Sequence, residues 1–205
     1  SDSQQKVESE NFIVRWNLQP KKEDVEKWKK GELVEPQKPI VYYIDPATPK
    51  KWRPYLIKGI NDWQAAFEKA GFKNAIICKD APTKAEDPNF DPEDARYSVI
   101  RWVAEPIANA MGPHVHDPRS GEIISAHIIF WHDIVKLSQM WYFIQCSAQD
   151  DRAKKIPLPD EITSELIRYV CAHEVGHTLG LRHNHRASQA YSIQQLRDPK
   201  FVAQY

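Results

Sequence analysis

Three histidines and a glutamate near the C-terminal end of the chain have the spacing of a metal site. His173 and His177 are four residues apart, so on a helix their imidazoles lie one turn apart on the same face and can reach one ion. Glu174 would point about 100° round that helix. It would therefore lie beside the ion, where a carboxylate can act on a water molecule without being a ligand.

Gly180 and His183 extend this pattern. Glycine adopts the left-handed backbone conformation without steric cost, so Gly180 can end the helix and turn the chain back. His183 can then return as a third ligand. Three neutral nitrogen ligands leave one position of a tetrahedral Zn²⁺ ion open, which is the arrangement of catalytic zinc sites. The sequence therefore predicts a zinc ion on His173, His177 and His183, with Glu174 as the general base.

The full pattern is too specific to be an accident of composition. In shuffled chains of this composition, His-Glu-x-x-His alone would occur in about 2% of cases, and the pattern with Gly180 and His183 at a frequency on the order of 10⁻⁵. Cys171 is a possible additional ligand by proximity. Residues i and i+2 do not face each other on a helix, so we expect Cys171 to be a buried structural thiol.

The stretch 173–183, HEVGHTLGLRH, resembles the signature of the metzincin zinc peptidases. The flanking ELI at 165–167 and HNH at 183–185 are similar to the large bacterial zinc-dependent peptidases of that clan. The resemblance covers residues 39–190. It implies a zinc-dependent endopeptidase that binds a protein or peptide substrate in extended form along an edge strand. It also implies export, to a secreted, periplasmic or cell-surface location.

One feature departs from the metzincin pattern. Metzincins carry a methionine turn beneath the zinc, C-terminal to the third histidine, whereas Met111 and Met140 both precede it. We therefore expect the chain to stop before the Met-turn and before the wall of the S1′ pocket. A non-catalytic zinc-containing module that binds peptides is the alternative. Glu174 disfavours that alternative, because binding alone requires no general base.

Composition sets the broad class. A chain of 205 residues, 41% apolar and 27% charged, suffices for one sizeable globular domain. Lys plus Arg and Asp plus Glu both number 28, so the chain has no net positive charge that would attract nucleic acid or an anionic membrane. The sequence has no run of 18 apolar residues and no signal-peptide core, so we expect no membrane insertion by this segment.

The elements that must position the site follow from hydrophobic periodicity. We expect residues 1–38 to be an N-terminal arm, the tail of a preceding segment, and residues 39–205 to be the metzincin-like catalytic domain. Within the arm, residues 12–18 have a strand-like composition, with every second residue from Phe12 to Leu18 apolar and on one face. The expected elements of the domain are strands at 40–44, 75–78 and 97–103 and helices at 52–70 and 134–148, followed by an active-site helix that Asp160 and Glu161 open.

This order predicts an α+β fold: a twisted mixed β-sheet packed with a backing helix and an active-site helix, as in the upper subdomain of a metzincin. The active-site helix should bury the face that carries Ile167, Cys171, Val175 and Thr178. Residues 107–112 and 122–130 both compete for the edge strand. Small residues at the end of the first segment would let a peptide approach closely, which favours it.

Two other groups of polar residues could bind metals. Asp87, Asp91 and Asp94 lie in a Pro-rich and Asp-rich segment, 79–95, but lack the spacing of a calcium loop, so we expect a solvated surface loop. A second, structural metal site could form from His114, His116 and His127, which flank the turn 117–121. No fourth ligand is evident. Ordinary hydrogen-bonded loop and strand histidines are therefore the favoured interpretation.

Overall fold

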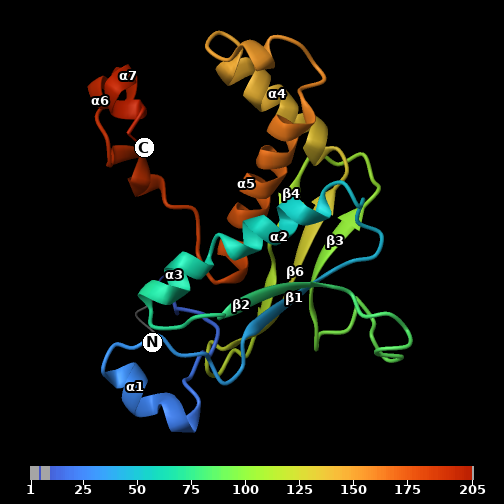
Figure 1. Ribbon diagram of the computed structural model, residues 1–205, viewed down its shortest axis with the longest axis vertical. Helices are drawn as coiled ribbons and strands as arrows, with labels where there is room; N and C mark the ends of the chain where they lie inside the picture. The colour runs from blue at the N-terminus through green and yellow to red at the C-terminus, as the bar shows by residue number, and fades with distance from the viewer. Residues whose placement is uncertain (1–4, 6–9, 205) are drawn as a thin grey trace.

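The computed structural model describes residue 5 and residues 10–204, and its centre is a mixed six-stranded sheet (Figure 1). The strands are β1 (Ile40–Ile44), β2 (Ile76–Asp80), β3 (Ser98–Val103), β4 (Ala110–Met111), β5 (His114–His116) and β6 (Ile123–Trp131). Their order is β2-β1-β3-β6-β4, and β5 pairs with a second part of β6. The strands β2, β1, β3 and β6 are parallel, whereas β4 and β5 run antiparallel to β6.

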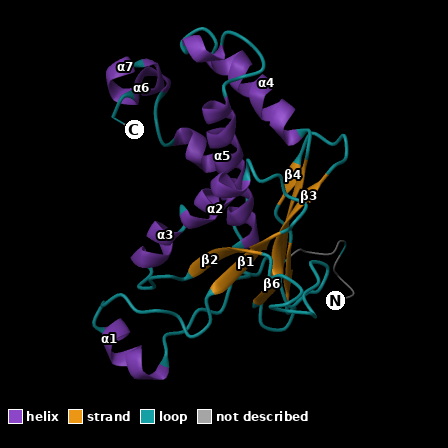
Figure 2. Ribbon diagram, turned by 45° about the vertical axis from the view of Figure 1, so that its right-hand side comes forward, coloured by secondary structure: helices purple, strands orange, loops and turns teal. Residues whose placement is uncertain are grey.

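Helices lie on one side of this sheet (Figure 2). They are α2 (Arg53–Asn61), α3 (Gln64–Lys69), α4 (Ile134–Cys146) and α5 (Asp160–Thr178). Of these, α2 and α5 pack directly against the strands, and α4 packs against α5. The main core forms where α2 and α5 meet the sheet, and its fully buried members include Tyr42, Ile44, Leu56, Ile60, Ile167 and Val175. The remaining helices are η1 (Lys22–Asp24), α1 (Val25–Lys29), η2 (Asp151–Ala153), η3 (His185–Gln189), α6 (Ile193–Arg197) and α7 (Pro199–Val202). The predicted α+β class, with a backing helix and an active-site helix, is confirmed.

The prediction of one continuous helix over residues 52–70 is wrong. The segment forms α2 and α3, with a turn at Asp62 and Trp63. Both turn residues bind α5: Arg168 donates to both carboxylate oxygens of Asp62, at 2.7 and 2.9 Å, and the Trp63 indole donates to the carbonyl of Ala172 at 2.9 Å. These contacts form between segments distant in sequence, so the local periodicity carries no sign of them.

The alternating segment 12–18 is extended but forms only one isolated bridge, Arg15 with Glu122, and no regular strand. Burial does alternate along the segment: Val14, Trp16 and Leu18 are half-buried, and the residues between them are exposed. Phe12 departs from it, because its side chain is 80% exposed. The segment thus lies against the sheet and α5 rather than joining the sheet as a full strand.

Of the two candidate edge segments, only the first lies at the edge of the sheet. β6 pairs with β3 on one side and with β4 and β5 on the other. β4 is the terminal strand in the sheet order, with β6 as its only neighbour in that order. The segment 107–112, which its small residues favoured, therefore contains the strand at this edge of the sheet.

The C-terminal elements η3, α6 and α7 stand away from the sheet, beyond α5 (Figure 1). Their large apolar side chains are largely exposed, Ile193 at 65% and Leu196 at 56%. Within residue 5 and residues 10–204, none of the helices has both the length and the apolar character needed to cross a bilayer.

Candidate metal centre

The helix α5 places His173 and His177 by burying the opposite face. Ile167, Cys171, Val175 and Thr178 recur at the helical period, and all four are 0% exposed. The Cys171 thiol lies 3.4 Å from the carbonyl oxygen of Leu56 in α2, and burial raises its pKa well above the usual value. Cys171 is therefore a neutral core thiol, as expected. With one face fixed in the core, the two histidines point outward, one turn apart.

The structure brings His173, His177 and His183 together. Their Nε2 atoms form a nearly equilateral triangle, with separations of 3.1 Å between His177 and each partner and 3.2 Å between His173 and His183. A tetrahedral zinc ion with Zn–N bonds of about 2.0–2.1 Å separates its nitrogen ligands by roughly 3.3–3.4 Å. The three rings thus fit one face of a zinc tetrahedron after a shift of a few tenths of an ångström.

Hydrogen bonding among the three nitrogens cannot account for this triangle. Each Nε2 atom either donates or accepts. In at least one of the three pairs, two donors or two acceptors therefore face each other, and that pair cannot form a hydrogen bond. The Nδ1 atom of His177 lies 2.9 Å from the carbonyl oxygen of Leu181 and donates to it, so in the neutral ring the Nε2 atom carries the lone pair. Burial, followed by the neighbouring rings of His177 and His183, lowers the pKa of His173. The cluster has the chemistry of a cation site.

A glycine turn returns His183 to the cluster. Gly180 has φ of +90°, the left-handed conformation that its position predicts. The Gly180 N–H donates to the carbonyl of His177 and the Leu181 N–H to that of Gly176, the two hydrogen bonds of a Schellman motif. The same turn therefore ends α5, presents the Leu181 carbonyl to His177 and directs the chain toward His183.

Glu174 lies beside the three imidazoles in the same cleft but outside the cluster that could hold an ion. Its side chain is 7% exposed, and burial raises its pKa, opposed by His177 and by a hydrogen bond from the backbone N–H of Gly112. A Cβ atom at Gly112 would overlap the carbonyl oxygen of Glu174. The residue after β4 must therefore be glycine for the edge strand to approach α5 this closely.

The cluster opens onto a cleft of about 630 Å³ between β4, α4 and α5. One wall is the edge segment 109–113. The other wall is apolar and combines residues of α4 with residues of α5, namely Ile134, Leu137, Trp141, Tyr169 and Val170. Trp141 is 55% exposed, so a large aromatic surface faces the open cleft.

The second group of histidines does not converge. His114, His116 and His127 do not bring three ligand atoms within reach of one ion, and His127 places its Nε2 atom 3.1 Å from the carbonyl of Tyr97. His114 pairs with Ala126, so strand alternation turns the neighbouring His127 to the opposite face. His114 donates to the carbonyl of His177, a structural contact with α5. Among the described residues, only His173, His177 and His183 form a possible metal cluster.

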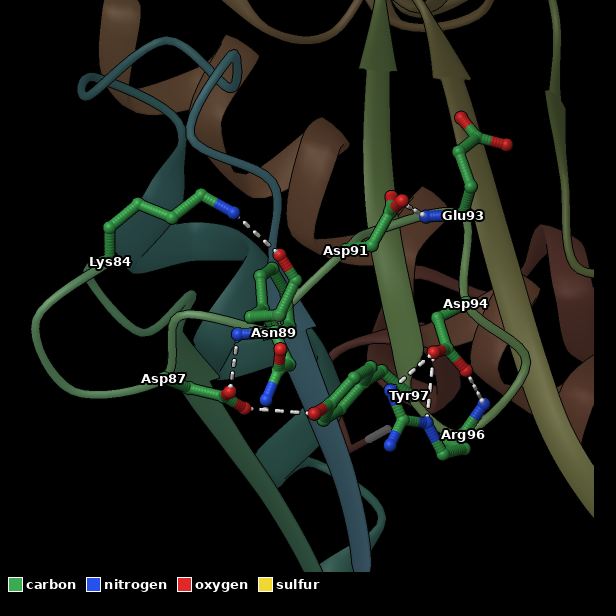
Figure 3. A network of polar contacts seen from close by, with 9 residues as sticks. Lys84, Asp87, Asn89, Asp91, Glu93, Asp94, Arg96 and Tyr97 are labelled. Carbon is green, nitrogen blue, oxygen red and sulfur yellow. Dashed lines mark hydrogen bonds and ion pairs between the residues drawn. The ribbon is translucent and has the colours of Figure 1, made fainter.

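The aspartates of the surface loop also have local partners (Figure 3). Asp87 accepts a hydrogen bond from the Tyr97 hydroxyl at 2.8 Å, and Asp94 binds the guanidinium of Arg96, which lowers the pKa of Asp94. Asp91 accepts from the backbone N–H of Glu93 at 2.9 Å. The three carboxylates order the loop separately and do not point toward a common cation. Most residues of this loop are exposed, as expected of a surface loop.

Several contacts around the centre come from groups that the motif does not include. They are the backbone N–H of Gly112 to Glu174, the carbonyl of Leu181 to His177, and the Trp16 indole, which donates to the Thr178 carbonyl at 3.0 Å. Backbone groups have no signature in a sequence. Trp16 is separated from Thr178 by 162 positions. The small residues at the end of β4 predicted close approach of a peptide, whereas the structure shows Gly112 in close approach to α5.

The comparisons agree with this geometry over part of the chain. Residues 155–205 match a family model described as Met-zincin. No curated protein and no solved structure matches the chain. The matched segment contains α5, Glu174 and all three clustered histidines. The resemblance predicted from the motif is thus confirmed for this segment, which is similar to a metzincin and indicates, at the level of the family, a zinc metallopeptidase that acts on peptides.

Proposed function

We propose that this protein is a zinc-dependent endopeptidase in which His173, His177 and His183 hold the metal and Glu174 is the general base. One observation carries the proposal: three Nε2 atoms within 3.2 Å of one another share a cleft with the Glu174 carboxylate. Three imidazole nitrogens that face one another present a divalent cation with three lone pairs when they are unprotonated. The fourth tetrahedral position would face the cleft, as hydrolysis requires.

The division of labour follows from the chemistry of each group. Zinc, when bound, supplies Lewis-acid polarisation of a carbonyl and makes a water molecule more acidic. Glu174 accepts a proton from the attacking water and passes it to the amine that leaves. The Gly112 N–H donates to the Glu174 carboxylate and favours its ionised form, the form that accepts a proton. The Leu181 carbonyl fixes the His177 ring so that its Nε2 faces those of His173 and His183, where it would hold the ion.

The substrate we infer is a peptide bound in extended form along β4. That strand is terminal in the sheet and lines the cleft at Ala110 and Met111, so its outer backbone groups can pair with a peptide. The apolar wall opposite favours a large apolar side chain next to the bond that is cleaved. The chain has a formal net charge of 0 at pH 7, so we expect shape and apolar contact rather than long-range charge attraction to select the peptide.

The test compares two glutamates on the same helix. Glu174→Gln should keep one zinc ion per chain and lower cleavage of denatured casein by at least about a hundredfold, because the base is lost and the ligands remain. Glu161→Gln, an exposed change at the start of α5, should leave cleavage unchanged. A chelator should block the wild-type activity. Retained activity in Glu174→Gln would refute the assignment of the base, and binding of peptides without cleavage by the wild type would favour a non-catalytic module.

The wider organisation is part of the same proposal. Residues 39–205 form the catalytic domain and residues 1–38 an arm that docks against it. We also infer export, to a secreted, periplasmic or cell-surface location, from the resemblance. Fractionation of cells that express the full-length protein tests the location, and recovery in the cytosol alone would contradict it.

A further inference from the structure

Residues 13–16, the N-terminal strap, cross between two glycine turns. A Cβ atom at Gly121 would lie 2.7 Å from the carbonyl oxygen of Ile13, and one at Gly180 would overlap the carbonyl oxygen of Val14. Successive carbonyls of an extended segment point to opposite sides, so the strap contacts the β5–β6 hairpin on one side and the end of α5 on the other. Both glycines have positive φ, of 73° and 90°.

Hydrogen bonds hold the strap to the hairpin. The backbone N–H of Arg15 donates to the Gly121 carbonyl at 2.9 Å, and the N–H of Ile123 donates to the Arg15 carbonyl at 2.9 Å. The strap is therefore anchored to β6, a central strand of the sheet. Its contact with α5 therefore connects that helix end to the sheet.

The last carbonyls of α5 show what the strap contributes. A helix leaves its final carbonyls without partners inside the helix. The Schellman turn satisfies those of Gly176 and His177 through Leu181 and Gly180. The Thr178 carbonyl accepts the indole N–H of Trp16 at 3.0 Å. Thr178 is 0% exposed, so water offers no easy substitute for Trp16.

The turn that the strap covers controls two of the three clustered histidines. The Leu181 carbonyl orients the His177 ring through Nδ1 at 2.9 Å. Gly180 directs the chain so that the His183 Nε2 lies 3.1 Å from that of His177. A movement of the turn would therefore displace both nitrogens from the positions that suit one ion, while His173, one turn earlier on α5, would keep its place.

We propose that the N-terminal strap is a positioning segment of the metal centre, with Trp16 as its main positioning residue. The strap holds the Schellman turn against the sheet so that His177 and His183 present their Nε2 atoms to the ion. The inference rests on the proposed function, because it requires a metal at the histidine cluster. It gives residues of the N-terminal arm a role in the chemistry of a motif far away in the sequence.

The experiment compares two tryptophans that each donate an indole hydrogen bond. Trp16→Phe removes the donor to Thr178, and Trp102→Phe removes a donor to His132, 3.3 Å away at the far end of the sheet. Zinc affinity is measured by competition with a chromogenic chelator, well below the unfolding midpoint of each variant. We expect Trp16→Phe to weaken zinc binding by about tenfold, as loss of groups that orient ligands does, and Trp102→Phe by less than twofold.

A second variant and a spectroscopic measurement keep the test decisive. Arg15→Pro removes the N–H that donates to Gly121, and its side chain is exposed, so it remains informative if Trp16→Phe does not fold. We expect about threefold weaker zinc binding and, with Co²⁺ in place of zinc, an altered visible absorption band in both strap variants. Zinc affinity and Co²⁺ spectra equal to those of the wild type would overturn the strap proposal alone. A wild-type protein that binds no zinc would overturn the proposed function as well.

Discussion

The molecule contains two groups of three histidines, and only one of them converges. His173, His177 and His183 place three Nε2 atoms within 3.2 Å of one another. His114, His116 and His127 do not bring their ligand atoms together in this way, and the His127 Nε2 instead lies 3.1 Å from the Tyr97 carbonyl oxygen. Both groups have the residue type that zinc prefers. Residue type alone therefore does not make the site.

The difference lies in backbone geometry. A helix repeats a direction every 3.6 residues, and the glycine turn adds a reversal, so three side chains can meet at one point. Successive side chains of a strand point to opposite faces of the sheet. Ala126 pairs with His114 and shares its face, so the next residue on β6, His127, points to the other face. In the second group, His114 and His127 bind backbone carbonyls, whereas in the first the three Nε2 atoms face one another, and a cation can satisfy all three lone pairs together.

The largest expected effect comes from removing one ligand of the converging group. His183→Ala should lower zinc affinity by at least about a hundredfold and abolish hydrolysis, because two imidazoles remain for an ion that needs three. His116→Ala, at an exposed position of the other group, should leave one zinc ion per chain. Metal analysis and chelator competition measure both variants. Loss of zinc from His116→Ala would show that the contrast between the groups is mistaken.

The next largest effect is expected at Gly180, in the turn that brings His183 to the converging group. Gly180→Ala combines a left-handed conformation with overlap of the Val14 carbonyl, so we expect it to lower the free energy of unfolding by about 2–4 kcal/mol and to weaken zinc binding. Gly31→Ala is a matched control, with φ of +84° and nothing within 4 Å of its Cβ.

The control should cost about 1–2 kcal/mol, the conformational part alone, and leave zinc affinity unchanged. Urea unfolding of both variants, with and without metal, separates the two contributions. Equal losses at the two glycines would mean that close approach of the strap contributes nothing to the turn.

Local sequence was sufficient where a repeating pattern determines the structure. The buried face of α5 follows from the helical period, and Ile167, Cys171 and Val175 are all 0% exposed. The strand β1 has the predicted bounds, Ile40–Ile44, because a short apolar run between turn residues leaves little choice. The positive φ of Gly180 follows from the position of a glycine after a helix.

Sequence was insufficient where the partner is distant. The break between α2 and α3 depends on Arg168 and the Ala172 carbonyl, both on α5. The same limit applies to the site: its histidines were predicted from spacing, but Trp16 reaches Thr178 across 162 positions. Hydrogen bonds from backbone groups, such as the Gly112 N–H to Glu174, depend on how the edge strand approaches the helix. Such contacts follow from the complete fold rather than from any short pattern.

A smaller effect is expected at the apolar wall onto which the converging group opens. Trp141→Ala should lower kcat/KM by about tenfold for peptides with a large apolar residue beside the cleaved bond, and by less than twofold for peptides with alanine there. Ile144→Ala, exposed on the same helix but outside the cleft, should change neither. Assays with two matched fluorogenic peptides measure the ratio. An equal fall for both peptides would contradict a role for Trp141 in selectivity.

The smallest effect tests the non-converging group directly. His127 must carry its proton on Nε2 to donate to the Tyr97 carbonyl, 3.1 Å away. His127→Ala should therefore lower the free energy of unfolding by about 1 kcal/mol, the usual contribution of one hydrogen bond, without changing zinc stoichiometry. His127→Gln retains an N–H donor and should lose less. If His127→Ala instead released a metal ion, the second group would be a structural metal site, and lone pairs rather than hydrogen bonds would explain both groups.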